Sequence, residues 1–257
     1  MKQVLFEISE NSMIAHDTYL MKLHGDVSGF AAPGQFIGIK LPGNFLRRPI
    51  SVCDIDDKGL TIIYKTLGKG TAEMASFHIG MTLDVLTALG NGYELSDAGQ
   101  TPLIIGGGVG IPPLYLLAKM LLKKGKTPTV VMGFNSKEDI FYEDKFSELG
   151  CPVLVTTADG SHGICGFAVD ALRGGSFSYI YTCGPIPMLK SVYDFASKHD
   201  IDGQFSFEER MGCGFGACMG CSIRVNALDE FGMPTGEISY KRVCKEGPVF
   251  RKEEIIW

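Results

Sequence analysis

The run Met211–Cys221 constrains this chain more than any other segment. It holds Cys213, Cys218 and Cys221 in the spacing C-x4-C-x2-C, and a fourth cysteine, Cys244, follows after a hairpin-like segment. Four thiolates in this spacing are the ligands of a [2Fe–2S] cluster, two for each iron. Glycines at four positions of the run are free to take positive φ angles and let N–H groups come close to sulfur. We therefore expect these four cysteines to be metal ligands.

Two other uses of the four cysteines stay open at this point. A structural zinc site usually has two short pairs of the CxxC type, whereas this run has one. Disulfides need an oxidising compartment, but Glu7 and Glu10 interrupt the apolar core that a signal peptide would need. The cluster is therefore favoured over zinc, and zinc over disulfides. The remaining cysteines without ligand spacing are Cys53, Cys151 and Cys165.

Composition excludes several classes of protein. The chain has 257 residues, of which 45% are hydrophobic and 21% charged, as in globular proteins with two or three domains. The net charge is −5 and there is no basic run, so nucleic acid is not an expected partner. No apolar run is long enough to span a bilayer. We expect a cytoplasmic protein with no membrane partner.

Residues 1–98 are predicted to form an antiparallel β-barrel. Short apolar runs alternate with turn residues, and one short helix is expected at Thr71–Phe77 with Thr71 as its N-cap. The expected strands are Val4–Ile8, Thr18–Leu23, Gln35–Ile39, Ile50–Cys53, Gly59–Lys65 and Thr82–Leu86.

Residues 99–203 alternate between strand and helix, which predicts a parallel-sheet α/β domain with helices on both faces. The expected strands are Thr101–Ile105, Thr127–Phe134, Pro152–Val155 and Ser178–Thr182, and the expected helices are Leu114–Lys123, Phe141–Leu149, Gly166–Leu172 and Pro185–Lys198.

Residues 204–257 are predicted to be a small cluster-binding domain. Gln204–Arg210 closes the sheet and enters the cysteine run, and a hairpin of Ser222–Val225 and Glu237–Tyr240 returns Cys244 to the other three cysteines. The expected fold class is thus multidomain, with a β-barrel, an α/β domain and a small C-terminal [2Fe–2S] domain.

Two segments of the middle domain are suited to a nucleotide. Gly108, Gly110 and Pro112 belong to a G-x-G-x-x-P loop after a buried strand, where glycines let the backbone approach a diphosphate. The triplet Cys183–Pro185 follows a later strand, and ligands of open α/β sheets bind beyond the carboxyl ends of strands. A 2′-phosphate would need an arginine, but only Lys137 is offered, so we expect NAD rather than NADP.

Two segments of the barrel are suited to a flavin nucleotide. The segment Arg48–Ser51 offers a charge for a phosphate and a hydroxyl for a ring edge, and Gly68-x-Gly70-Thr71 opens a helix whose N–H groups can bind an anion. Their combination resembles the FAD-binding barrel of the ferredoxin–NADP reductase family, which also uses the G-x-G-x-x-P loop for its nicotinamide nucleotide.

The resemblance implies roles for individual residues. It implies that Arg48 contacts the flavin phosphates, that Ser51 lies near the reactive ring edge and that Cys183 positions and shields the nicotinamide. Because Ile50 stands where many members have a stacking Tyr, Tyr64 is expected to take part of that role. The full set implied for FAD is Arg48, Pro49, Ile50, Ser51, Ile63, Tyr64, Lys65, Gly70 and Thr71, and for NAD it is Gly108, Gly110, Pro112, Cys183, Gly184 and Pro185.

The order of barrel, nucleotide domain and cluster loop resembles one branch of that family, the electron-transfer subunits of NAD-dependent dihydroorotate dehydrogenase B. This resemblance implies an oxidoreductase subunit in pyrimidine (UMP) synthesis, partnered by an FMN-containing catalytic subunit in a heterotetramer of two copies of each. Electrons would pass from FMN through the cluster and FAD to NAD⁺. The alternatives are an NAD(P)H–ferredoxin or sulfide oxidoreductase subunit of the same architecture, and a non-catalytic zinc-binding scaffold subunit.

Overall fold

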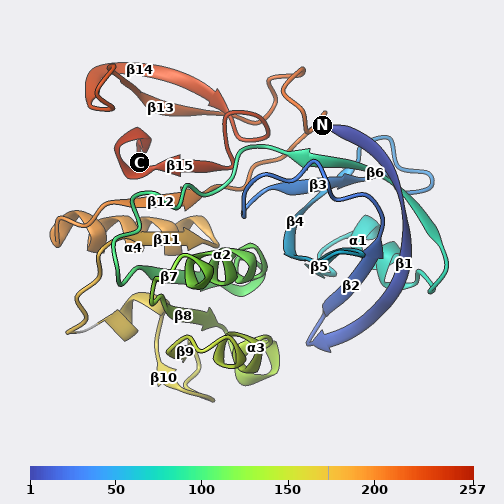
Figure 1. Ribbon diagram of the computed structural model, residues 1–257, viewed down its shortest axis with the longest axis horizontal. Helices are drawn as coiled ribbons and strands as arrows, with labels where there is room; N and C mark the ends of the chain where they lie inside the picture. Colours follow the sequence, from blue (N-terminus) through green and yellow to red (C-terminus); the bar gives the residue numbers. More distant parts are fainter. Residues whose placement is uncertain (173) are drawn as a thin grey trace.

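The computed structural model describes residues 1–172 and 174–257. A closed β-barrel, a twisted sheet with helices on its faces and a C-terminal hairpin are packed against one another (Figure 1). The fold class expected from the sequence is confirmed. Within the described residues, no helix has the length and apolar character needed to cross a membrane.

Six antiparallel strands close the barrel in the order β1-β2-β5-β4-β3-β6. Alternate side chains point inward and form one core that includes Phe6, Met21, Ile37 and Ile62, all fully buried. Every expected strand is present, and several extend further than expected. The bounds are β1 Lys2–Ala15, β2 Thr18–His24, β3 Phe36–Ile39, β4 Arg48–Ile55, β5 Gly59–Lys65 and β6 Thr82–Leu89.

The short helix of the barrel, α1 (Lys69–Ala75), begins earlier than expected. Its N-cap is Gly68, so the prediction of Thr71 as the N-cap was wrong. Thr71 is the third helical residue, and its hydroxyl oxygen accepts hydrogen bonds from the N–H groups of Leu67 and Gly68 at 3.1 and 3.3 Å. The Thr71 side chain therefore stabilises the turn before the helix from a position in the first helical turn.

The second sheet has the order β10-β9-β8-β7-β11-β12-β15, and all its pairings are parallel except that of β12 with β15. Helices α2 (Pro112–Lys123) and α3 (Glu143–Glu148) pack on one face, and α4 (Ile186–Lys198) packs on the other. The strands are β7 Leu103–Gly107, β8 Thr129–Phe134, β9 Val153–Thr157, β10 Ile164–Cys165, β11 Ile180–Cys183, β12 Gly203–Ser206 and β15 Val249–Arg251. The segment expected as a helix at Gly166–Leu172 contains a 3-10 helix at Ala168–Leu172.

The C-terminal segment is joined to this sheet more closely than expected. The hairpin consists of β13 (Ser222–Leu228) and β14 (Pro234–Arg242), but the chain then returns as β15 to pair with β12. Strands therefore continue across the expected boundary at residue 204, and the division into 1–98, 99–203 and 204–257 stays a prediction.

Tyr93 fastens the segment after the barrel to the second sheet. Its ring is buried and meets the ring of Tyr181 edge-on at 5.7 Å, and its hydroxyl donates to the carbonyl oxygen of Thr182 at 2.9 Å. A buried hydrogen bond of this kind contributes about 1 kcal/mol.

We expect Tyr93→Phe to lower the free energy of unfolding by about 1 kcal/mol, because it removes the hydroxyl and keeps the ring. Urea unfolding measures the change. Tyr240→Phe is the matched control because Tyr240 is 64% exposed. Equal losses in the two variants would contradict the assignment of this bond.

Candidate functional site

The first pair of cysteines is held by a loop between β12 and β13. The sulfur of Cys213 accepts the N–H groups of Ala217 at 3.2 Å and Cys218 at 3.4 Å, and the sulfur of Cys218 accepts the N–H of Cys213 at 3.5 Å. The loop folds back on itself because Gly214 and Gly216 have φ of +77° and +91°. Amides directed at sulfur are the environment that an anionic cluster needs.

The second pair lies at the base of the hairpin. Antiparallel pairing of Ser222 with Arg242 brings Cys221, next to Ser222, close to Cys244, two residues after Arg242, and the N–H of Cys244 donates to the sulfur of Cys221 at 3.4 Å. Both side chains are buried. The hairpin thus brings Cys244 back to the cysteine run, as the expected topology requires.

Cys213 and Cys244, one from each pair, differ in electrostatics. Burial raises the pKa of Cys213, but hydrogen bonds from the N–H groups of Phe215, Cys218 and Ala217 outweigh it and bring the pKa to about 6. Burial, followed by the neighbouring Cys221, raises the pKa of Cys244 to about 12. The Cys244 thiol therefore needs a cationic partner to ionise, which a bound metal would supply.

In the described part of the chain, no three His, Cys, Asp or Glu side chains converge as ligands of a single metal ion would. The four cysteines instead form two pairs with amides directed at sulfur. Amides directed at sulfur suit the negative charge of an iron–sulfur cluster.

The cysteine loop packs against the barrel strand that carries the predicted flavin residues. Pro49 on β4 and Cys213 on the loop line the same small cavity of about 10 Å³, together with Leu86 and Leu89 of β6. The cysteine run and the flavin segment, more than 150 residues apart in sequence, are thus neighbours in the structure.

The two flavin segments also meet. A Cβ added to Gly70 would lie 2.4 Å from Nε of Arg48, so the guanidinium rests directly on the backbone of α1. Asn44 and the carbonyl of Leu46 hold the guanidinium in place, at 2.6 and 2.9 Å. Arg48 and Gly70 can therefore contact a single phosphate group together.

The structure corrects the expectation for Tyr64. Its side chain is 2% exposed in the barrel core, where it stacks on Tyr19 at 5.8 Å and its hydroxyl donates to Asn11 at 2.8 Å. The ring therefore has no free face for a flavin. Ile63 is also buried, whereas Ile50 and Ser51 are half-buried on β4.

A cavity of about 320 Å³ lies beyond the carboxyl ends of β7, β8 and β9. Of the six residues expected to bind NAD, only Gly108 and Pro185 line it. A Cβ on Gly110 would lie 2.3 Å from the carbonyl oxygen of Cys183, so Gly110 is needed for close packing against the end of β11. Pro112, Cys183 and Gly184 are also not among the residues that line the cavity.

Cys183 is suited to shielding rather than to nucleophilic attack. Burial raises the pKa of its thiol to about 12, so the sulfur stays protonated near neutral pH. A protonated thiol is compatible with hydride transfer, which needs no nucleophilic side chain, and the role of Cys183 at the nicotinamide stays a prediction.

Sequence reasoning missed several residues of the cavity wall. Asp139 follows β8 and pairs with Lys65 of the barrel at 3.0 Å, so the two domains meet at the cavity. Phe167, which is 72% exposed, stands at the wall near Asn135. The signal for Asn135 and Asp139 was their place after a parallel strand, whereas Phe167 has no local signal. Lys65 is the one basic residue among the described residues of this wall, and it is already paired.

Comparison with known proteins identifies the family. Residues 208–256 match the iron–sulfur cluster binding domain of dihydroorotate dehydrogenase B. The dihydroorotate dehydrogenase B (NAD(+)) electron transfer subunit of Geobacillus sp. (strain WCH70) is 43% identical, over 100% of this chain and 99% of the relative. This chain belongs to the family of those electron-transfer subunits. The subunit of the same name from Fusobacterium nucleatum is 40% identical, over 96% of each chain.

Solved structures agree with this assignment. An NADH-dependent reduced ferredoxin–NADP oxidoreductase, described for flavin-based electron bifurcation, has a TM-score of 0.84 and 34% identity, covering 98% of this chain and 90% of that one. A cytochrome P450 reductase of Amycolatopsis shares the fold, with a TM-score of 0.68 and 21% identity over 77% of this chain and 66% of that one. These findings confirm the expected family, its oxidoreductase class and its cofactor types, which are an iron–sulfur cluster, a flavin and NAD.

Proposed function

We propose that this chain passes electrons from an FMN-containing dihydroorotate dehydrogenase subunit through a [2Fe–2S] cluster and FAD to NAD⁺, in pyrimidine synthesis. The observation that carries this proposal is the position of the barrel between the two other sites. Pro49 on β4 lines a cavity with Cys213, and Lys65 on β5 lines the nucleotide cavity. A flavin can exchange one or two electrons, so it can join a one-electron cluster to a hydride carrier.

Four cysteines are the proposed cluster ligands, Cys213, Cys218, Cys221 and Cys244. The amides of Ala217 and Cys218 support this, because hydrogen bonds to sulfur stabilise the charge of an iron–sulfur cluster. The hairpin holds the buried pair rigidly, while the exposed loop carries Cys218 toward the surface. This exposure suits electron exchange with a partner.

We assign FAD to the surface of β4 and α1. Arg48 and Gly70 would hold the phosphates, and Ser51 would face the ring edge. Arg47, the neighbour of Arg48, has a different role. It pairs with Asp84 at 2.8 Å and donates to the carbonyl of Gly38, so it fastens two barrel strands.

We expect Arg48→Gln to weaken FAD binding by about 10- to 100-fold, because a charge-assisted hydrogen bond is worth about 1.5–3 kcal/mol. Flavin released on gel filtration measures the effect. Arg47→Gln is the matched control. It should lower the melting temperature but leave flavin retention close to the wild-type level. Retention of FAD by the Arg48 variant at the wild-type level would contradict the assignment.

We assign NAD to the 320 Å³ cavity, with Gly108 at the diphosphate and Pro185 beside the nicotinamide. The paired Lys65 leaves no free arginine or lysine for a 2′-phosphate among the described residues of the wall, which favours NAD over NADP. The reactive end of the nucleotide would lie toward Lys65, where the cavity meets the barrel.

We further propose a cytoplasmic heterotetramer of two copies of this chain and two FMN-containing subunits. The name of the relatives as electron-transfer subunits supports a catalytic partner. Sedimentation of the two co-expressed chains measures the mass of the complex. A stable heterodimer with one copy of each chain would contradict the tetramer.

Purification with the partner subunit tests the function. We expect iron and flavin in the chain, absorption bands that bleach with NADH, and reduction of NAD⁺ when dihydroorotate is added. A colourless chain that carries zinc would reject the proposal. The high similarity to the NADH-dependent ferredoxin–NADP oxidoreductase favours one second candidate, a subunit of that kind. Cluster and flavin bands without dihydroorotate-dependent activity, together with ferredoxin-dependent activity, would support that candidate.

A further inference from the structure

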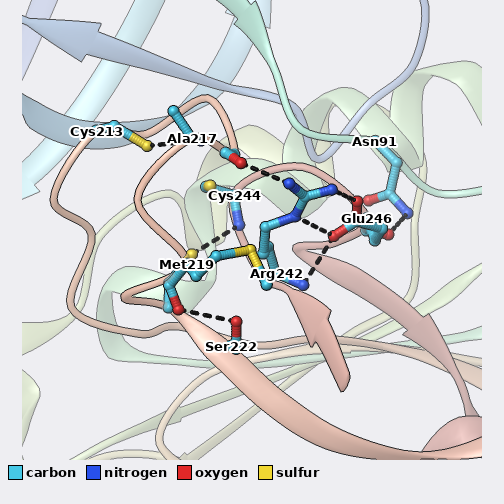
Figure 2. A network of polar contacts seen from close by, with 10 residues as sticks. Asn91, Cys213, Ala217, Met219, Ser222, Arg242, Cys244 and Glu246 are labelled. Carbon is cyan, nitrogen blue, oxygen red and sulfur yellow. Dashed lines mark hydrogen bonds and ion pairs between the residues drawn. The ribbon is translucent and has the colours of Figure 1, made fainter. Parts of the chain in front are cut away.

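One arginine contacts the cysteine loop without being a cysteine ligand. Arg242 is the last residue of β14, and its guanidinium donates to the carbonyl oxygen of Gly216, which lies between Cys213 and Cys218 (Figure 2). Neither the cysteine spacing nor the family resemblance described above assigns a function to Arg242.

The bond acts on a planar group. The carbonyl of Gly216 and the N–H of Ala217 belong to one peptide unit, and in a trans peptide they point in opposite directions. Arg242 takes the oxygen, and the N–H on the other side donates to the sulfur of Cys213 at 3.2 Å. Fixing one end of the unit fixes the other, and a cation on the oxygen also strengthens the N–H as a donor.

The loop depends on this support because its own backbone is permissive. Gly216 has a φ of +91°, and a Cβ there would lie 2.5 Å from Cδ of Lys245, so a residue with a side chain would be strained at this position. A glycine peptide can rotate between conformations that other residues cannot adopt. An external contact is therefore needed to select the rotation that directs the N–H of Ala217 at sulfur.

Arg242 is itself held in one orientation. Its Nε donates to Glu246 at 2.9 Å, its terminal nitrogen pairs with the same carboxylate, and its backbone N–H donates to it at 2.8 Å. Asn91, after β6, donates to the backbone carbonyls of Glu246 at 2.8 Å and Val249 at 2.9 Å. The guanidinium is thus anchored to the barrel end of the molecule (Figure 2).

We propose that Arg242 is a positioning residue for the iron–sulfur site, and that the charges of Arg242 and Glu246 shift the reduction potential of that site in opposite directions. This inference rests on the proposed function. Arg242 is paired on the neighbouring strand with Ser222, next to Cys221, and lies two residues before Cys244. A positive charge there stabilises the reduced cluster, which carries one more electron, and a negative charge does the opposite.

The test is a redox titration of the purified chain, followed by EPR, with iron and flavin content measured on the same samples. We expect Arg242→Gln to shift the cluster potential to more negative values, by a factor of about ten in the equilibrium constant for reduction, or about 59 mV for one electron. We expect Glu246→Gln to shift it to more positive values. Opposite signs separate a charge effect from a loosened loop, which would shift both variants alike.

Conservative and control variants complete the test. Arg242→Lys keeps the positive charge but loses the planar guanidinium that bonds Glu246 and Gly216 together. Its shift should therefore be smaller than that of the glutamine variant. Lys241→Gln is the control, because Lys241 is the adjacent cation on β14 but pairs with Glu254 of the C-terminal turn. If Arg242→Gln holds no iron, the signs are compared in the lysine and Glu246→Gln variants.

Three outcomes would overturn the inference: an unchanged potential in Arg242→Gln, shifts of one sign in both single variants, or an equal shift in Lys241→Gln. Absence of iron from the wild-type chain would instead reject the proposed function, so the two failures are distinguishable.

Discussion

Replacing Cys218 by serine is expected to lower electron transfer between this chain and its partner by more than about a hundredfold. The loss of an outer-shell group near a metal costs about 10–100-fold, and the loss of a ligand should cost more. Oxidation of NADH by a small dye should continue, because in the proposed route the flavin meets NADH without the cluster. The two rates are measured on one preparation, with flavin content as the check that FAD is still bound.

Cys165→Ser is the matched control for this experiment. Cys165 is also exposed, but it lies on β10 at the opposite edge of the sheet from β15 and outside the cysteine loop. Its substitution should leave both rates unchanged. Equal loss of partner-linked and dye-linked activity in Cys218→Ser, with FAD retained, would reject the proposed order of the carriers.

Replacing Gly110 by alanine is expected to destabilise the chain by about 3 kcal/mol, at the upper end of the cost of overpacking a core. The new Cβ would lie 2.3 Å from the carbonyl oxygen of Cys183 and 2.6 Å from the amide of Gly184. Neither atom can move alone, because β11 pairs with strands on both sides. Denaturant unfolding measures the loss. The KM for NADH should rise as well, since Pro185 of the cavity wall follows the displaced segment.

Gly29→Ala is the control for the added methyl group. Its Cβ would meet only the Cβ of Ala88, at 3.5 Å, which is ordinary contact. The expected change is within about 0.5 kcal/mol, as for most surface substitutions. If Gly110→Ala is equally mild, the close approach of the glycine loop to β11 is not rigid.

The residues implied by resemblance were located with unequal success. Arg48 and Gly70, which the resemblance assigns to the flavin phosphates, lie against each other, and their role there stays a prediction. The Tyr64 side chain points into the barrel and not toward the predicted flavin surface, since alternation along β5 places it in the barrel core. The sequence pattern named the strand correctly but not the side of the sheet on which this ring lies.

The same distinction holds for the nucleotide loop. The G-x-G-x-x-P pattern predicts a tight turn between β7 and α2, and the turn is present. Its glycines have different roles, however. A Cβ on Gly108 would meet no atom within 4 Å, and its backbone lines the cavity, whereas Gly110 is packed against Cys183. Only a neighbouring strand, distant in sequence, separates these roles.

Strand β15 had no local signal in the sequence. Strand β15 is three residues long and pairs with β12 only after the hairpin has returned the chain. A segment so short carries too few alternating residues for a pattern. The shared sheet that it completes is why the cysteine loop is held close to both other domains.

The sequence by itself determined which chemistry this chain is built for. The spacing of four cysteines, the glycine loop and the alternation of apolar residues are local properties, and each restricts the backbone within a few residues. Only the tertiary structure decided how these parts act together. Lys65 meets Asp139, Pro49 meets Cys213 and Arg242 holds the peptide of Gly216 because closure of the barrel and pairing of β15 bring distant segments together. Such contacts depend on the packing of whole elements, which no stretch of sequence contains.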